Sequence, residues 1–251
     1  MKVSEKDKAK TRIKILEAAV DVITEKGFKS ASMREIARRA KVGDATIYNY
    51  FPSKEKLLYG YCEYVQQQVL DSLKEIEDFH EYSLHEQLQQ FVETQLHTWL
   101  PAREFLQEVF KLTYYSPVAG GAYLNRTRKI FTRIITDMLE AAIEAGEIPA
   151  QPYQELLPRL FWDYLTGVMA YWLKDDSENF TNTTQLVDKS MEIIASILYQ
   201  GMIGKSLDLI SFLFRSHVMM HFDSFNGTSA ESSPEKGAAK YIKRHFMEKI
   251  K

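Results

Sequence analysis

Residues 32–51, SMREIARRAKVGDATIYNYF, constrain the fold more than any other segment, because they encode two short helices around a tight turn. Ser32 and Glu35 have the spacing of a capping box, in which serine and glutamate side chains satisfy backbone N–H groups at a helix start. Small apolar residues of the first helix recur at helical spacing: Ile36, Ala37 and Ala40. Gly43 is expected to make the turn, because glycine tolerates a sharp change of direction.

The second short helix is predicted over residues 44–50. Ile47 and Phe51 are four residues apart and form its buried side. Its other sides carry hydroxyl and amide groups: Thr46, Tyr48, Asn49 and Tyr50. Two short helices of this kind around a turn are the arrangement that places a recognition helix in the major groove of DNA.

The surrounding residues complete a small helical domain. An amphipathic helix is predicted over residues 11–26, and Gly27 is expected to end it. Pro52 ends the second short helix, and Ser53 is a candidate N-cap for a long helix that follows. We therefore predict a three-helix helix-turn-helix domain over residues 1–55, here called the head.

The stretch KTRIKILEAAVDVITEKGFKSASMREIARRAKVGDATIYNYFPSKEKLL, residues 10–58, resembles the N-terminal DNA-binding domain of the TetR family of bacterial transcriptional regulators. The elements that agree come in the same order: Ile15-Leu16-Glu17-Ala18-Ala19, Lys26-Gly27-Phe28, Ile36-Ala37, Val42, Thr46-Ile47-Tyr48, Phe51 and Ser53-Lys54-Glu55. The resemblance implies a homodimeric repressor on a palindromic operator, released by a small hydrophobic ligand inside a helical body.

The candidate DNA-contacting residues are Ser32, Arg34, Thr46, Tyr48, Asn49, Tyr50 and Lys54. Lys54 and the three hydroxyl side chains of the second helix are expected at phosphates, and Asn49 at a base edge, with adenine as its geometric match. The chain departs from the family at Asp44-Ala45, where a Lys-Gly pair is usual. An acidic residue there either loses a phosphate contact or reads the amino group of a cytosine.

Charge is distributed unevenly along the chain. Residues 1–60 contain ten Lys and four Arg against eight Asp and Glu, a net charge of +6, whereas the whole chain carries −2. A positive N-terminal segment before an acidic remainder is typical of a DNA-binding domain attached to a solvated body. A charged face without a partner is the alternative interpretation.

The composition argues against several other classes of protein. Cys62 is the single cysteine and is interpreted as a buried apolar residue, with a redox-sensing thiol as the less favoured alternative. The six histidines have no carboxylates at metal-binding spacing, and no catalytic motif is present, so we predict neither an enzyme, a metal site nor a cofactor. No apolar run is long enough to span a membrane, which predicts a cytoplasmic protein.

The rest of the chain has helical periodicity throughout, so the predicted fold class is all-α. Residues 56–203 are predicted to form a ligand-binding and dimerisation body, with helices over 53–79, 84–99, 102–115, 123–145, 152–173 and 184–202. The last two carry wide apolar faces, which in the family pair across a two-fold axis. Aromatic residues are frequent here, and those proposed to line a pocket are Phe110, Tyr114, Trp162 and Tyr171.

Residues 204–251 are predicted to be a C-terminal extension with an amphipathic helix, a linker over 226–237 and a basic tail helix over 238–251. The tail helix can lie on an anionic membrane, dock on the body or remain frayed. It supports a rival interpretation, a TetR-fold accessory protein that binds lipid and touches the membrane through its C-terminal helix. The positive head and the polar second helix favour DNA binding.

Overall fold

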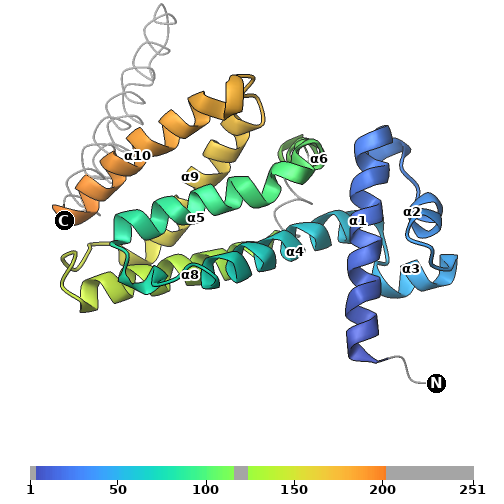
Figure 1. Cartoon of the computed structure of the whole chain (residues 1–251), viewed down its shortest axis with the longest axis horizontal. Helices are drawn as coiled ribbons and strands as arrows, with labels where there is room; N and C mark the ends of the chain where they lie inside the picture. Colours follow the sequence, from blue (N-terminus) through green and yellow to red (C-terminus); the bar gives the residue numbers. More distant parts are fainter. Residues whose placement is uncertain (1–3, 116–123, 202–251) are drawn as a thin grey trace, which may run out of the picture. The chain divides into compact units, whose positions relative to one another are not determined.

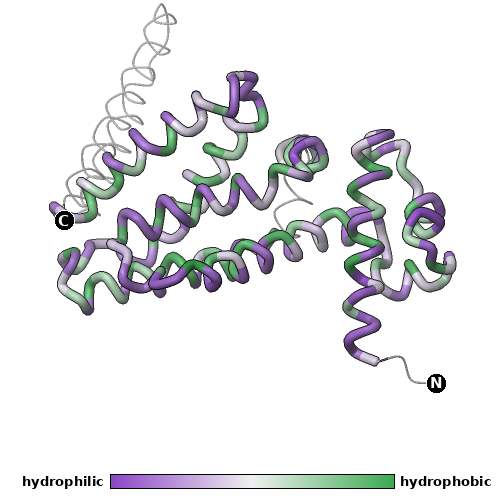
Figure 2. The backbone as a smooth tube through the Cα atoms, viewed as in Figure 1, coloured by the Kyte–Doolittle hydropathy of each residue, from purple (hydrophilic) through white to green (hydrophobic). Residues whose placement is uncertain are grey.

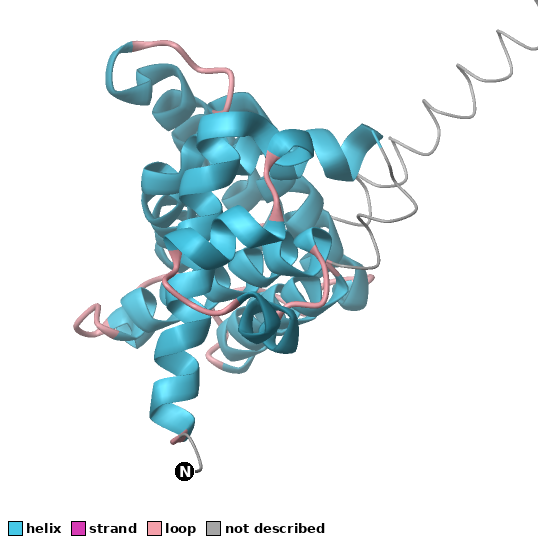
Figure 3. Cartoon of the chain, turned by 90° about the vertical axis from the view of Figure 1, so that its right-hand side faces the viewer, coloured by secondary structure: helices cyan, strands magenta, loops and turns pink. Residues whose placement is uncertain are grey.

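A computed structural model describes residues 4–115 and 124–201, and within these ranges the chain forms helices and loops without a strand (Figures 1 and 3). The predicted all-α class is confirmed. The helices are α1 (Glu5–Ser30), α2 (Met33–Arg39), α3 (Asp44–Tyr50), α4 (Lys54–Lys74), α5 (Leu84–Trp99), α6 (Arg103–Tyr115), α8 (Asn125–Glu144), α9 (Leu157–Trp172) and α10 (Thr181–Tyr199). Residues 1–202 form one compact unit, and the predictions for 204–251 lie outside the described residues.

The head is built as its capping signals and apolar spacing predict. Glu35 N–H donates to Ser32 Oγ at 3.2 Å, and Ser32 N–H donates to a Glu35 carboxylate oxygen at 3.3 Å, which completes the capping box. α1 packs on α2, and α2 packs on α3. The core between them consists of fully or almost fully buried apolar side chains: Leu16, Ala19, Ile23, Ile36, Ala37, Ile47 and Phe51.

The turn between α2 and α3 differs from the expectation for Gly43. Gly43 has φ −70° and serves as the N-cap of α3, whereas Lys41 takes the left-handed conformation with φ 56°. The Lys41 N–H donates to Arg38 C=O at 3.2 Å, and the Val42 N–H donates to Ala37 C=O at 3.0 Å. These two bonds form a Schellman motif, which satisfies the last carbonyls of α2 and reverses the chain at Lys41.

Gly27 interrupts α1 rather than ending it. Its φ of 76° and ψ of 157° break the helix, and one further turn then runs to Ser30. At the other end, α1 begins at Glu5, because the Ser4 side chain accepts the Asp7 N–H and caps the first turn. A glycine is required at position 27, since side-chain-bearing residues rarely adopt this φ.

α4 crosses the boundary predicted between residues 55 and 56, because it begins at Lys54 and continues through the body. A Cβ atom on Gly60 would lie 2.8 Å from Cε1 of Phe51, so α4 passes directly against the residue that ends α3. α4 ends at Lys74, earlier than the predicted residue 79, and Asp78 reverses the chain with φ 55°.

The body consists of α4, α5, α6, α8, α9 and α10, whose apolar sides face one another. In Figure 2, hydrophobic and hydrophilic positions alternate along each helix, as expected for amphipathic helices packed on one side. The ring of Phe131 lies at the centre, 5.3 Å from the Phe91 ring and 6.0 Å from the Phe161 ring by their centroids. α10 packs on both α5 and α9.

Candidate DNA-binding surface and ligand cavity

The outward side of α3 presents the polar groups that the sequence predicts for base and phosphate contact. Tyr48 is 53% exposed and Asn49 is exposed, while Thr46 and Tyr50 are half-buried. Ile47 is completely buried and holds α3 against the head from the opposite side. The structure therefore gathers four of the seven predicted DNA-contacting residues on one short helix.

Arg34 and Asp44 join the exposed sides of α2 and α3. Arg34 Nε donates to Asp44 Oδ2 at 2.9 Å, and the side chains are 86% and 54% exposed. Asp44 therefore neutralises a cation beside α3. Ser32 is exposed as well, but its hydroxyl already donates to a Glu35 carboxylate oxygen at 3.0 Å within the capping box.

The predicted phosphate ligand Lys54 has a different position in the structure. Its Nζ donates to the carbonyls of Phe28 at 2.7 Å and Ala31 at 2.6 Å, and lies 4.7 Å from the centre of the Phe28 ring. The ammonium group satisfies carbonyls left free at the C-terminal end of α1. Lys54 thus joins the start of α4 to the end of α1 and is not grouped with the α3 side chains.

A cavity of about 320 Å³ lies inside the body between α4, α5, α6, α8 and α9. Apolar and aromatic side chains form most of its wall: Cys62, Trp99, Leu106, Val109, Phe110, Leu124, Trp162, Leu165 and Met169. Phe110 and Trp162 were among the residues proposed from the sequence. Tyr171 is 45% exposed and does not line the cavity, because it lies on the outer side of α9. The side chain of Tyr114 lies outside the described residues.

Six polar side chains also line this cavity: Gln66, Gln95, Thr113, Thr127, Arg128 and Thr166. Gln95 Nε2 donates to Gln66 Oε1 at 3.0 Å. The two glutamines were not among the predicted pocket residues, although each carries a signal in the sequence. Gln66 stands four residues after Cys62, and Gln95 stands four residues after Phe91, so both interrupt apolar helix faces.

Cys62 in the cavity wall is a buried thiol that donates to the Leu58 carbonyl. Burial raises its pKa to about 12, so the thiol stays protonated at neutral pH. The favoured interpretation of Cys62 as a buried apolar residue agrees with this environment.

One hydrogen bond links the cavity helix α6 to the head. Glu108 Oε2 accepts the backbone N–H of Phe28 at 3.1 Å, next to the break at Gly27, and its other oxygen pairs with Lys111 at 2.8 Å. The hydrogen bond from Lys111 is the main cause that lowers the pKa of Glu108, and the Phe28 N–H adds to it. Because Lys54 binds the carbonyl of the same Phe28, a single residue connects α6, α1 and α4.

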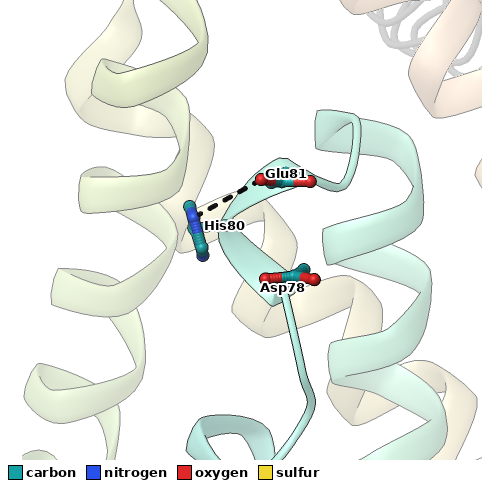
Figure 4. A group of neighbouring side chains, drawn as sticks. All are labelled: Asp78, His80 and Glu81. Atoms are coloured by element: carbon teal, nitrogen blue, oxygen red, sulfur yellow. Dashed lines mark ion pairs between the residues drawn. The ribbon is translucent and has the colours of Figure 1, made fainter.

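Three side chains shortly before the start of α5 are of types that can bind metal ions. Ligand atoms of Asp78, His80 and Glu81 lie within 4.8 Å of one another, and His80 Nε2 is 4.0 Å from Glu81 (Figure 4). All three side chains are exposed on a single 3-10 turn. Exposed acidic groups of this kind are common without an ion, and we assign no metal to them.

No helix in the described part of the chain is both long enough and apolar enough to cross a membrane.

The comparisons with known proteins agree with this arrangement. A model of tetR-family bacterial regulatory proteins matches residues 15–59, and a model of the tetracyclin repressor-like C-terminal domain matches residues 87–213. The second match alone covers half of the chain. The chain belongs to the TetR family. It is therefore related to DNA-binding transcriptional regulators along the head and most of the body.

Individual TetR relatives are distant. The regulator UidR of Escherichia coli K12 is 27% identical over 161 residues, which cover 64% of this chain and 80% of UidR. Among solved structures, GusR of Salmonella enterica has a TM-score of 0.60 at 23% identity, covering 76% of this chain and 95% of GusR. FadR of Bacillus subtilis, solved in complex with stearoyl-CoA, has a TM-score of 0.55 at 21% identity. The match covers 75% of this chain and 98% of FadR. The similarity to GusR and FadR shows that this chain shares their fold.

Proposed function

We propose that this TetR-family chain is a ligand-responsive repressor that binds a palindromic operator as a homodimer in the cytoplasm. A small hydrophobic effector in the body cavity releases it from DNA. The observation that carries this proposal is the exposed polar side of α3, with Tyr48 and Asn49 outward and Ile47 buried. A short helix held in this way presents hydrogen-bonding groups that can enter a major groove.

The homodimer is supported by the apolar residues that α9 and α10 leave exposed: Leu160, Tyr171, Leu186 and Ile193. Ile193 is the most exposed of these four side chains, at 61%. Neighbouring exposed apolar side chains on two adjacent helices are typical of a protein interface. A two-fold dimer would present two copies of α3 to two half-sites, which is the reason to expect a palindromic operator.

The effector is supported by the cavity and by its connection to the head. The cavity has the size and the mainly apolar wall of a small-molecule site. α6, which lines it, contacts the head through Glu108 and the Phe28 N–H. An effector that prefers a different position of α6 would shift the head between two arrangements. FadR, a transcriptional regulator of the same fold, was solved with stearoyl-CoA, a ligand with a long apolar acyl chain.

The experiment is a titration of the full chain against the DNA upstream of its own gene. Asn49→Ala should cost about 1–3 kcal/mol of binding free energy and relax the sequence preference. Asn182→Ala, at an exposed asparagine of α10, serves as the matched control and should bind as the parent chain does. Unchanged binding by Asn49→Ala would refute the assignment of α3 as the recognition helix.

The rival function is a TetR-fold accessory protein that binds lipid and meets the membrane through its C-terminal helix. The same preparation separates the two proposals. Co-sedimentation with anionic vesicles, together with no affinity for the upstream DNA above that for random DNA, would favour the accessory protein. The net positive charge of the head, with the exposed hydroxyl and amide groups of α3, favours the regulator, because it suits a phosphate backbone.

A further inference from the structure

Two polar atoms in the wall of the body cavity have no hydrogen-bond partner. They are Nε2 of Gln66, on α4, and Oγ1 of Thr127, on α8. The two residues are only 4% and 6% exposed, so these atoms can meet a partner only through the cavity. A buried unsatisfied donor costs about 1–3 kcal/mol, and native proteins keep few of them without a reason.

The orientation of Gln66 indicates what kind of group would satisfy it. Its Oε1 accepts from Gln95, so the amide nitrogen is the atom left to bind a ligand. An amide nitrogen is a donor only, and a threonine hydroxyl can donate in addition. A ligand that satisfies both atoms therefore has to offer an oxygen that accepts hydrogen bonds.

Arg128 adds a positive charge to the same wall. It lies one residue after Thr127, is half-buried, and forms no ion pair with a carboxylate anywhere in the described ranges. Its neighbour Arg126 does form one, at 3.6 Å from Glu63, and does not line the cavity. A half-buried guanidinium without a carboxylate favours an anionic oxygen over a neutral one.

We propose that the cavity binds a small apolar carboxylate. Gln66 Nε2 and Thr127 Oγ1 donate hydrogen bonds to its oxygens, and Arg128 balances its charge. The apolar part of the ligand lies among the aromatic side chains Trp99, Phe110 and Trp162. The inference deepens the proposed function, because it names the chemistry of the effector expected at that site.

The size of the cavity guides the choice of ligand length. A water molecule in the liquid takes up about 30 Å³, so a cavity of about 320 Å³ holds on the order of ten non-hydrogen atoms of that size. This corresponds to a medium-length aliphatic acid. Decanoate is the probe, and decanol and decanoyl-coenzyme A test whether the carboxylate itself is recognised.

The experiment follows tryptophan fluorescence of the full chain during titration with each probe. Trp99 and Trp162 line the cavity, so an occupant should change their emission. We expect decanoate to bind saturably and decanol to bind at least about tenfold more weakly, because it offers no charge to Arg128. Decanol binding as tightly as decanoate, or decanoyl-coenzyme A binding more tightly, would overturn the assignment of a carboxylate.

Two variants and one control test the named residues. Thr127→Val removes an unpartnered hydroxyl at nearly constant volume, so it should keep or raise the melting temperature while weakening decanoate binding. Arg128→Met should weaken decanoate about tenfold and leave decanol unchanged. Arg126→Met, two residues from Arg128 and outside the cavity, should not alter decanoate binding. Decanoate affinity that is the same in all three variants would refute the proposal.

Operator binding measured in the same samples separates this inference from the proposed function. Decanoate that binds but leaves the DNA complex intact supports the carboxylate site and contradicts its role in release. A chain that binds its operator but no apolar carboxylate contradicts the inference alone.

Discussion

Arg34 Nε lies 2.9 Å from Asp44 Oδ2, so an exposed ion pair joins α2 to the first turn of α3. Exposed pairs of this kind contribute only about 0–1 kcal/mol to stability. The larger consequence is electrostatic, because the pair neutralises the Arg34 cation next to the first turn of α3. If α3 enters DNA as proposed, Asp44 should moderate the attraction between this head and the phosphates.

Asp44→Asn should release Arg34 and remove a negative charge that faces phosphate. We expect tighter binding to operator and random DNA alike, and a salt dependence steeper by about one phosphate contact. Binding titrations at several salt concentrations measure both. Asp137→Asn, at an exposed position of α8, is the control for net charge. A loss of affinity for the operator alone would instead show that Asp44 reads a base.

Lys54→Met should destabilise the head without changing the salt dependence of DNA binding. The variant removes the ammonium that holds the Phe28 and Ala31 carbonyls, and hydrogen bonds to a charged group contribute about 1.5–3 kcal/mol. Urea unfolding should show a loss of about that size. Lys14→Met, at an exposed position of α1, should unfold as the parent chain does. A weaker salt dependence of DNA binding with unchanged stability would show instead that Lys54 contacts a phosphate.

Glu108→Ala should weaken the connection between α6 and the head, because the Phe28 N–H loses its acceptor. The expected loss of stability is about 1–3 kcal/mol, and Glu108→Gln should lose less, since its amide oxygen can still accept this bond. Thermal unfolding of the two variants measures the difference. Equal losses in both would show that the charge of Glu108 matters and the bond to Phe28 does not.

The contribution of Glu108 to the free energy of unfolding should also depend on pH. Its folded-state pKa is lowered from the ordinary value of 4.5, so the carboxylate stabilises the fold above that value. The stabilisation is lost as the pH falls below 4.5 and through the folded-state pKa. The stability difference between the parent chain and Glu108→Gln should therefore shrink over this range in urea titrations from pH 6 to pH 3.

Ile193→Glu should abolish the proposed homodimer. The Ile193 side chain is 61% exposed on α10. A glutamate carboxylate buried there in the proposed dimer interface would have no charged partner. Light scattering after size-exclusion chromatography should then give the mass of one chain, and operator affinity should fall. Gln185→Glu adds the same charge at an exposed polar position of the same helix and serves as the control. A dimeric Ile193→Glu would contradict the proposed interface.

Much of the fold was predictable because its determinants are local. Ser32 and Glu35 are three residues apart, and the apolar spacing of Ile47 and Phe51 sets the buried side of α3 without reference to any other helix. The outward polar groups of α3 follow directly from that spacing. Three points differ: the reversal after α2 falls on Lys41, α1 continues past Gly27, and α4 ends at Lys74.

The contacts that distinguish this chain join residues far apart in the sequence. Phe28 meets Glu108 across 80 positions, and Gln66 meets Gln95 across 29. Periodicity predicts which side of a helix is apolar, but it does not say which helix that side will meet. The sequence therefore determined the helix class, the caps at Ser32 and Ser53 and the polar side of α3, which depend on neighbours within about four residues. Packing alone decided that Lys54 would bind α1, that Asp44 would pair with Arg34, and that a cavity would form with two unpartnered donors in its wall.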